Sequence, residues 1–216
     1  MMKKILAAFV AAMGLAASAQ AGEVYGNVGL PGVMLGYAQP VSDSLTLRAD
    51  LGTLGSHDKD YEESGINYQG TAKLHRAGVF ADWFAFGGGF RFTGGATFQN
   101  ARLDLTADGA GQSFDIGGQT VVLAPGDRFD VRIKYPSVMP YLGIGYGHQP
   151  SGTGWGSVFD LGVSIGKPKV TGKVSGPTLS GQVSQEDVDA ELAELRDDVG
   201  DIKVLPQLSI GVNYRF

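Results

Sequence analysis

The chain has three histidines, the side chains best suited to act as general bases near neutral pH. Ser56 and His57 are adjacent, so on a strand their side chains point to opposite faces. His75 has no serine two residues away on its own face, and His148 lies in a short turn near Ser151. A general base needs a nucleophile within hydrogen-bond reach, so these positions predict no catalytic site, and we expect no enzymatic activity.

Carboxylates near the first histidine offer oxygen ligands for a divalent cation. The spacing of Asp58, Asp60 and Glu62 begins like a calcium-binding loop, but Glu63 stands where glycine is needed and Gln69 where a bidentate acid belongs. We therefore expect a solvated acidic loop over 56–67, with no built metal site and no other cofactor. Such a loop is suited to sharing Mg²⁺ or Ca²⁺ with phosphate groups outside the chain. The chain has no cysteine, which excludes disulfides, thiolate metal sites and an acylated cysteine anchor.

Charged side chains also recur within segments that alternate with period two, where one face is apolar and the other polar. The last thirteen residues, Val204 to Phe216, show the pattern most fully, with apolar side chains on one face and Gln, Ser, Gly, Asn and Arg on the other. Buried charge must be paired to be tolerated, so we interpret the charges as an ion-pair network in a polar interior. Seven residues form this predicted lumen network: Arg48, Asp50, Arg76, Asp82, Arg91, Asp160 and Arg215.

The N-terminus has the features of an export signal. Lys3 and Lys4 precede a short apolar run, and Ser18-Ala19-Gln20-Ala21 ends in a small-residue cleavage site. We predict a signal peptide over 1–21 and a mature domain over 22–216. No later stretch reaches the roughly 20 apolar residues of a transmembrane helix, so a membrane would have to be crossed by strands. The formal net charge of −5, made more acidic by loss of the two lysines, argues against nucleic-acid binding.

The elements that position the charges are predicted to be long antiparallel strands joined by alternately short and long connections. Short turns are expected at 40–43, 87–88 and 149–154, and long loops at 56–67, at 108–127 with a small hairpin, and at 176–200. Slips in the alternation near Asn100 and Pro136 predict a bulge and an irregularity. The last long loop contains a helix capped by Ser184, with an apolar stripe that packs on its own loops or, alternatively, binds a partner: Val188, Leu192, Leu195, Val199 and Ile202.

Alternating loop lengths are typical of an outer-membrane barrel with short periplasmic turns and long outer loops. Counting 23–39 as one strand gives seven, and a closed barrel with both ends in the periplasm needs an even number. We therefore place a tight outer hairpin at 29–32, which divides this segment into two short strands. The predicted fold class is all-β, an eight-stranded antiparallel transmembrane β-barrel with long outer loops and one short helix before the last strand.

Several segments carry a resemblance to a known family. P-Y-L-G-I-G-Y-G (140–147) and G-V-N-Y-R-F (211–216) resemble the opacity-protein-like small outer-membrane β-barrels of Gram-negative bacteria. R-A-D-L-G (48–52), G-G-G-F-R-F-T-G-G (87–95) and G-S-V-F-D-L-G-V (156–163) are similar to a functionally uncharacterised branch of that family. The resemblance implies that Tyr214 and Phe216 form the terminal aromatic signal read by the barrel-assembly machinery.

The sequence therefore predicts an integral protein of the bacterial outer membrane, exported with a cleaved signal peptide. An eight-stranded barrel has an interior that side chains can fill, so we expect a plugged lumen and a structural or surface-interaction role. Expected partners are outer-membrane lipid and lipopolysaccharide, the barrel-assembly machinery, periplasmic chaperones and an unidentified surface ligand. The alternative is passage of small hydrophobic molecules, which leave through a wall gap near Leu30 to Gly36. A lipid-modifying enzyme is a distant third.

Overall fold

Eight antiparallel strands form a closed hydrogen-bonded ring in a computed structural model that describes residues 22–216 except 64–65, 109–110, 112, 117 and 201–202. The predicted signal peptide lies outside the described residues. The ladder runs β5-β4-β3-β2-β1-β12-β10-β9 and closes where β9 pairs with β5. The ring strands are β1 (Glu23–Leu30), β2 (Gly32–Ser42), β3 (Leu45–Glu63), β4 (Ile66–Trp83), β5 (Phe90–Asp108), β9 (Val138–Tyr146), β10 (Gly154–Ile165) and β12 (Val204–Arg215).

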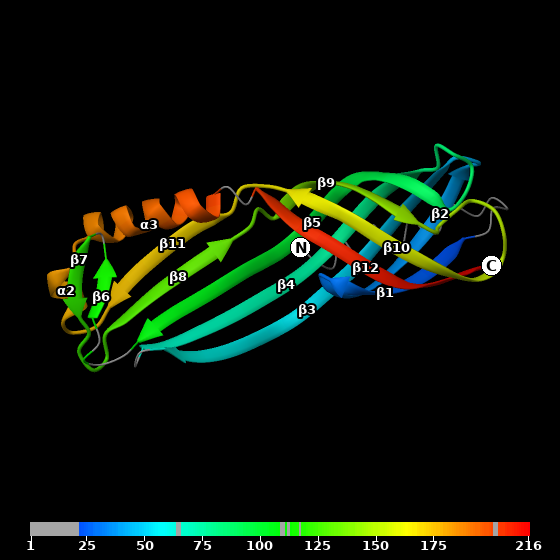
Figure 1. Ribbon diagram of the computed structural model, residues 1–216. Coiled ribbons are helices and arrows are strands. Elements are labelled where there is room, and N and C mark those ends of the chain that lie inside the picture. Colours follow the sequence, from blue (N-terminus) through cyan, green and yellow to red (C-terminus); the bar gives the residue numbers. More distant parts are fainter. Residues whose placement is uncertain (1–21, 64–65, 109–110, 112, 117, 201–202) are drawn as a thin grey trace, which may run out of the picture.

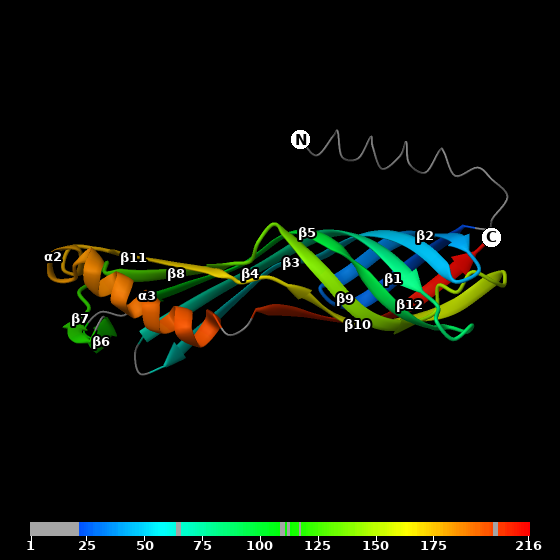
Figure 2. The same cartoon turned by 90° about the horizontal axis from the view of Figure 1, so that it is seen from above.

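The remaining elements build an extension at the end of the ring that lies away from the carboxy-terminus (Figures 1 and 2). There the long upper parts of β3, β4 and β5 continue past the ring and are joined by β8 and β11 in one curved sheet. Within the described residues, no helix has the length and apolar character needed to cross a membrane. The elements outside the ring are β6 (Ser113–Ile116), β7 (Gln119–Val122), β8 (Arg128–Lys134), β11 (Lys169–Ser175), α2 (Leu179–Gln182) and α3 (Gln185–Gly200).

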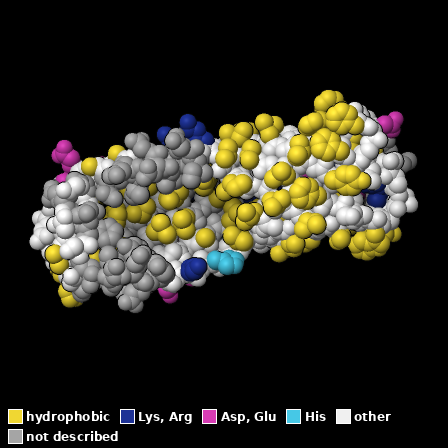
Figure 3. Space-filling model, in the orientation of Figure 1, with side chains coloured by type: hydrophobic (Ala, Val, Ile, Leu, Met, Phe, Trp, Pro, Cys, Tyr) yellow, Lys and Arg dark blue, Asp and Glu magenta, His cyan; other side chains and the backbone are white. Residues whose placement is uncertain are grey.

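The ring turns its apolar side chains outward. In β12, Leu208, Ile210 and Val212 are about half exposed, whereas their neighbours Ser209 and Asn213 are buried, as the period-two pattern predicts. Each of the eight strands carries such outward apolar residues, and hydrophobic side chains cover much of the visible face of the barrel half (Figure 3). The ring is therefore apolar outside and polar inside, the reverse of a water-soluble barrel.

The hairpin predicted at 29–32 is present. β1 and β2 pair from Glu23–Ala38 to Gly29–Gly32, and β2 pairs onward with β3 from Val33–Thr53. The wall gap expected near Leu30 to Gly36 is therefore wrong, because the glycines of this segment fit between paired neighbours instead of breaking the ladder. At Gly32 the backbone has a φ of 101°, a conformation that glycine adopts without a steric penalty.

The acidic stretch 56–67 is not the loop that its composition predicts. β3 and β4 stay paired out to Glu63–Ile66, with one irregularity between Thr53 and Gly55, so the strands extend well beyond the ring. Polar residues are compatible with strands at this level because one face of the extended sheet is open to solvent.

The bulge predicted at Asn100 is also wrong. β4 and β5 remain in register along their whole length, and the pairing of β5 passes from β9 to β8 without a shift. The backbone hydrogen bonds Gln99 N–Ser137 O and Tyr135 N–Ala101 O bridge the interval between β8 and β9. What changes is the polarity of the two faces. In the ring the inward face is polar, whereas on β8 and β11 of the extension the corresponding face is apolar and packs against α2, α3 and the β6–β7 hairpin.

The extension has a hydrophobic core of its own. The inward face of β8 and β11 packs against α2, α3 and the β6–β7 hairpin, which confirms the small hairpin expected in 108–127. Ser184 caps α3 as predicted, because its side chain accepts from Asp187 N–H while the Asp187 carboxylate accepts from Ser184 N–H. The buried members of this extension core are Ile116, Val121, Leu123, Phe129, Val170, Leu179, Val183, Val188 and Leu192.

The predicted stripe of α3 is described only in part. Val188 and Leu192 are buried against the extension sheet, so at these positions the stripe packs on its own chain. The side chains of Leu195 and Val199, and the whole of Ile202, lie outside the described residues. A short helix, α2, lies before α3 inside the predicted 176–200 loop, where the sequence predicted one helix, and the strand β11 ends just before that loop.

Asp127 ties the β7–β8 connection to the start of α2. Its carboxylate accepts backbone N–H hydrogen bonds from Ala124 at 2.8 Å, Thr178 at 3.0 Å and Leu179 at 3.2 Å. Burial alone would raise the pKa of Asp127, but these donors stabilise the charged form more strongly, and the net pKa lies below its usual value. The ionised carboxylate is thus part of the fold of the extension.

Candidate functional site: a charge network in the lumen

Four strands contribute one charged side chain each to a layer across the lumen. Arg48 from β3 contacts Asp82 from β4 and lies 3.1 Å from Asp160 of β10. Arg91 from β5 bridges the same two carboxylates, at 3.2 Å to Asp82 and 2.8 Å to Asp160. All four are buried, and each arginine holds both acids, so the layer is a closed ring of alternating charge.

Further hydrogen bonds stabilise the charged side chains of this central layer. Thr93 donates to Asp82 at 2.7 Å and accepts from Arg91 at 2.8 Å, and Arg91 Nε donates to the Gly147 carbonyl at 3.1 Å. Asn27 donates to Asp160 at 3.3 Å. The many partners matter because charges removed from water are tolerated only when they are paired and hydrogen-bonded.

A second layer lies on the extension side of the first. One nitrogen of Arg76 lies 2.7 Å from each oxygen of Asp50, and the guanidinium also contacts Gln207. Gln207 donates to Ser164 at 2.6 Å, and Ser164 hydrogen-bonds Thr97 at 3.0 Å. Polar contacts therefore continue across the ring from β4 to β12, β10 and β5.

A third group closes the end of the ring near the termini. Arg215 of β12 lies 2.6 Å from Glu23 of β1, and His148 contacts the other oxygen of Glu23. The sequence predicted Arg215 but missed both partners. The sequence does carry a signal that places Glu23 in the lumen, because Glu23, Tyr25 and Asn27 alternate with the outward Val24 and Gly26. His148 carried no such signal, since the chain after β9 folds back into the lumen and only the tertiary structure shows it.

The structure thus brings the seven predicted residues together in three groups. With Glu23 added, four arginines face four carboxylates, so the formal buried charge is balanced. Aromatic rings fill the space between the charges: the guanidinium carbon of Arg48 lies 5.0 Å from the Phe80 ring centre, and that of Arg76 lies 5.5 Å from it. The cavity that these residues line has a volume of about 10 Å³, no more than a single water needs.

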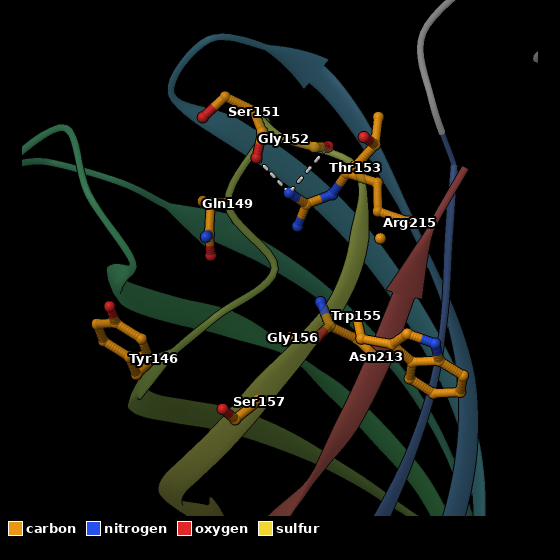
Figure 4. A pocket seen from close by; sticks show the side chains of 11 residues that line it. Tyr146, Gln149, Ser151, Gly152, Thr153, Trp155, Gly156, Ser157, Asn213 and Arg215 are labelled. Atoms are coloured by element: carbon orange, nitrogen blue, oxygen red, sulfur yellow. Dashed lines mark hydrogen bonds between the residues drawn. The ribbon is translucent and has the colours of Figure 1, made fainter.

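A larger hollow lies at the terminal end, where the wall is incompletely paired. The β9–β10 ladder begins at Tyr146–Phe159, and below it Gly154 to Val158 pair only with β12. A pocket of about 150 Å³ opens beside this free edge (Figure 4). On the inner side of this pocket, Arg215 donates hydrogen bonds to the carbonyls of Ser151 and Gly152 (Figure 4). These hydrogen bonds hold the 147–153 turn across the opening.

The other candidate residues lie apart from the lumen network. His75 is exposed and hydrogen-bonds Thr53 at 2.8 Å, and Asp58 accepts from Thr71 at 2.7 Å. Across the part of the chain that the structure describes, no three histidine or acidic side chains gather in a way that could hold a metal. The side chains of Glu62 and Glu63 fall outside that part. Tyr214 and Phe216 are exposed on the outer wall, and Tyr214 packs on Trp155 with ring centres 5.3 Å apart.

The closed ring of eight antiparallel strands, apolar outside and charged inside, matches the outer-membrane β-barrel fold. Among solved structures, the chain is similar to CarO of Acinetobacter baumannii, with 24% identity and a TM-score of 0.62 over 91% of this chain and 98% of that chain. It is also similar to CarO2 of the same organism, with 21% identity and a TM-score of 0.61 over 91% and 99%.

A major outer membrane protein from Thermus thermophilus shares 14% identity over 92% of this chain and 100% of that chain, with a TM-score of 0.46 that is too low to carry an inference. No family model and no curated protein sequence matches the chain. These likenesses show the fold alone, and the resemblance to opacity proteins stays a prediction.

Proposed function

We propose that residues 22–216 form an outer-membrane β-barrel with a lumen closed by its charge network, which displays the extension outside the cell for surface interaction. The observation that carries this proposal is the central layer, in which Arg48 and Arg91 each bridge Asp82 and Asp160 across the lumen. Side chains so held leave no continuous water path, which favours a structural or interaction role over bulk transport.

Placement in a membrane is supported by the outer wall. Outward Leu35, Leu142 and Ile210 are each more than half exposed, and comparable residues recur on all eight strands. An apolar surface of that extent is unfavourable in water, and exposed apolar patches beyond a few hundred Å² mark contacts with a membrane or a partner. Aromatic side chains gather near the terminal end, as expected of an interfacial girdle: Trp83, Phe86, Phe90, Phe92, Tyr146, Trp155 and Tyr214.

The orientation follows from the connections. The terminal end has short turns and the opposite end has the long extension, so the termini are assigned to the periplasm and the extension to the outside. In this arrangement Tyr214 and Phe216 are available to the barrel-assembly machinery, and periplasmic chaperones would carry the exported chain. Outer-membrane lipid and lipopolysaccharide would surround the wall.

Two measurements on the purified protein test this proposal. The protein should run at different apparent masses on gels before and after boiling, because a folded barrel resists detergent, and it should show no stable conductance in planar bilayers. Arg91→Ala should introduce measurable current, because it removes a bridge of the central layer, whereas Arg132→Ala on the extension surface should not. An apparent mass that boiling does not change, or a steady wild-type current, would overturn the proposal.

Lateral passage of small apolar molecules is the second candidate. It is favoured by the pocket at the free edge of β10, where Gly154 to Val158 lack a second strand partner among the described residues. The Arg215–Glu23 pair lies on its inner side and would have to be bypassed. Uptake of a small apolar fluorescent dye should be unchanged by deletion of the protein if the lumen is closed, and a marked drop would favour passage.

A further inference from the structure

Four cations form a single row across the extension sheet. Lys73 of β4 lies opposite Arg102 of β5, Arg102 lies opposite Lys134 of β8, and Lys134 lies opposite Lys169 of β11. Directly opposite residues of antiparallel strands point to the same face with their Cβ atoms about 5 Å apart. The row therefore places four positive side chains side by side on one surface.

This surface is the one turned away from the extension core. Ile133 and Val170, the immediate neighbours of Lys134 and Lys169, pack against the apolar cluster beneath α3. Side chains alternate along a strand, so Lys134 and Lys169 point to the other face, and both are exposed. The same face continues downward into the outer wall of the ring, through Phe98 on β5 and Val138 on β9, which are 46% and 57% exposed.

The acids of this face, Asp58, Asp104 and Asp130, lie above the row, and among the described side chains only Asp104 pairs with one of its cations. Asp104 lies 3.3 Å from Arg102 and also contacts Arg132. For Lys73, Lys134 and Lys169, no ion pair with an acid exists among the described side chains. Like charges placed opposite one another destabilise a sheet, and this chain is acidic as a whole, so the accumulation is unfavourable unless an anion joins it.

The height of the row above the apolar wall indicates which kind of anion these cations would meet. Arg102 follows Phe98 by four residues on β5, which is about 13 Å along a strand, and Lys134 lies directly opposite Arg102. With the usual tilt of barrel strands, that is about 10 Å along the membrane normal. The headgroup layer begins directly outside the hydrocarbon core and is about 5–8 Å thick for ordinary phospholipids. The ammonium groups, on long flexible stems, reach back into that layer.

We propose that Lys73, Arg102, Lys134 and Lys169 bind the phosphate groups of anionic lipid in the leaflet next to the extension, a bisphosphorylated glycolipid of the lipid A type being the best match. Two phosphates on one headgroup can contact two neighbouring cations of the row at once. This inference rests on the proposed membrane placement and deepens it, since it assigns the extension a lipid partner. Binding would also hold the sheet upright on the membrane surface.

The test compares two triple variants that remove equal charge. In one, the three lysines of the row become glutamine: Lys73→Gln, Lys134→Gln and Lys169→Gln. In the control, three other surface cations of the extension are replaced: Lys59→Gln, Arg128→Gln and Lys173→Gln. Native mass spectrometry of delipidated protein in detergent measures the binding of added lipid A, of phosphatidylglycerol and of zwitterionic phosphatidylcholine at low ionic strength.

The wild type and the control should prefer lipid A over phosphatidylcholine, and the row variant should lose this preference. Loss of three lysines should weaken lipid A binding about 100-fold, which corresponds to about 1 kcal/mol for each cation. The difference should shrink at 0.5 M salt because exposed charges are screened. Equal lipid A binding by the row variant and the wild type would overturn the inference, as would inhibition by millimolar inorganic phosphate as strong as by free lipid A.

The gel-mobility shift on boiling is recorded for every protein. A variant that keeps the shift has a folded barrel, so its binding result bears on the row alone. A wild type that lacks the shift would contradict the membrane proposal itself. The two failures are therefore distinguishable.

Discussion

Replacing Asp82 by asparagine should show whether charge balance holds the lumen together. The Asp82 side chain is fully buried and contacts Arg48, Arg91 and Thr93. Asparagine preserves its size but removes its charge, so that two buried arginines share only Asp160. Breaking a buried ion pair by neutralising one partner typically costs about 3–5 kcal/mol, because an uncompensated charge is left behind.

A second change should restore part of this loss. Arg91→Gln added to Asp82→Asn leaves one arginine and one carboxylate in the central layer, so the buried charge is balanced again. We expect the double variant to be more stable than the sum of the single changes by about 1–3 kcal/mol. Asp104→Asn, which affects an ion pair on the exposed face of the extension, should cost less than about 1 kcal/mol.

The assay is reversible urea unfolding in lipid vesicles, followed by tryptophan fluorescence. Trp83 and Trp155 both lie on the outer wall and are 56% and 78% exposed in the isolated chain, so they should report transfer from lipid to water. A loss below about 1 kcal/mol for Asp82→Asn, or strict additivity in the double variant, would refute the view that charge pairing organises the lumen.

Three further predictions concern the extension. Asp127→Asn should loosen the start of α2 and raise protease cleavage there. In the wild type, the contribution of Asp127 to stability is complete above its ordinary pKa of 3.8 and is lost as pH falls through the lowered folded-state pKa. Wild type and variant should therefore be cleaved equally only in strong acid. Leu192→Asp should make the helix region protease-sensitive while the gel shift of the barrel persists, whereas Ala193→Asp at the exposed neighbouring position should have little effect. Lys59→Cys should react with an impermeant thiol reagent on intact cells and Ser42→Cys should not, and the opposite pattern would reverse the orientation; the chain has no native cysteine to interfere.

Local alternation of residue types was enough to predict the ring. Side-chain direction along a strand has a fixed period of two, so the sequence of β12 or β10 already separates a lipid-facing side from a lumen-facing side. The eight strands, the hairpin at 29–32 and the capped helix at 185–200 followed from that pattern, from loop lengths and from the Ser184 cap. Charged residues on the polar side were visible in the same way.

The prediction from residue types was wrong where the environment of one face of a strand changes along its length. Leu103 and Leu105 lie on the inward face of β5, the same face that carries Arg91 and Thr93 lower down, and the switch looked like a bulge at Asn100. The backbone does not change there. What changes is the environment of that face: above the ring β5 pairs with β8, whose Phe129, Val131 and Ile133 belong to or pack against the apolar cluster beneath α3 on the same face.

Cross-strand register is the other property that only the tertiary structure decided. Lys73, Arg102, Lys134 and Lys169 are scattered through nearly a hundred residues and form a row only because four strands meet at one level. Likewise, Glu23 and His148 reach each other because β1 closes on β12 and the 147–153 turn folds inward. The sequence by itself determined which face of each strand is apolar, since that depends on adjacent residues. Which charges meet depends on pairing between distant strands, and that is a property of the folded chain.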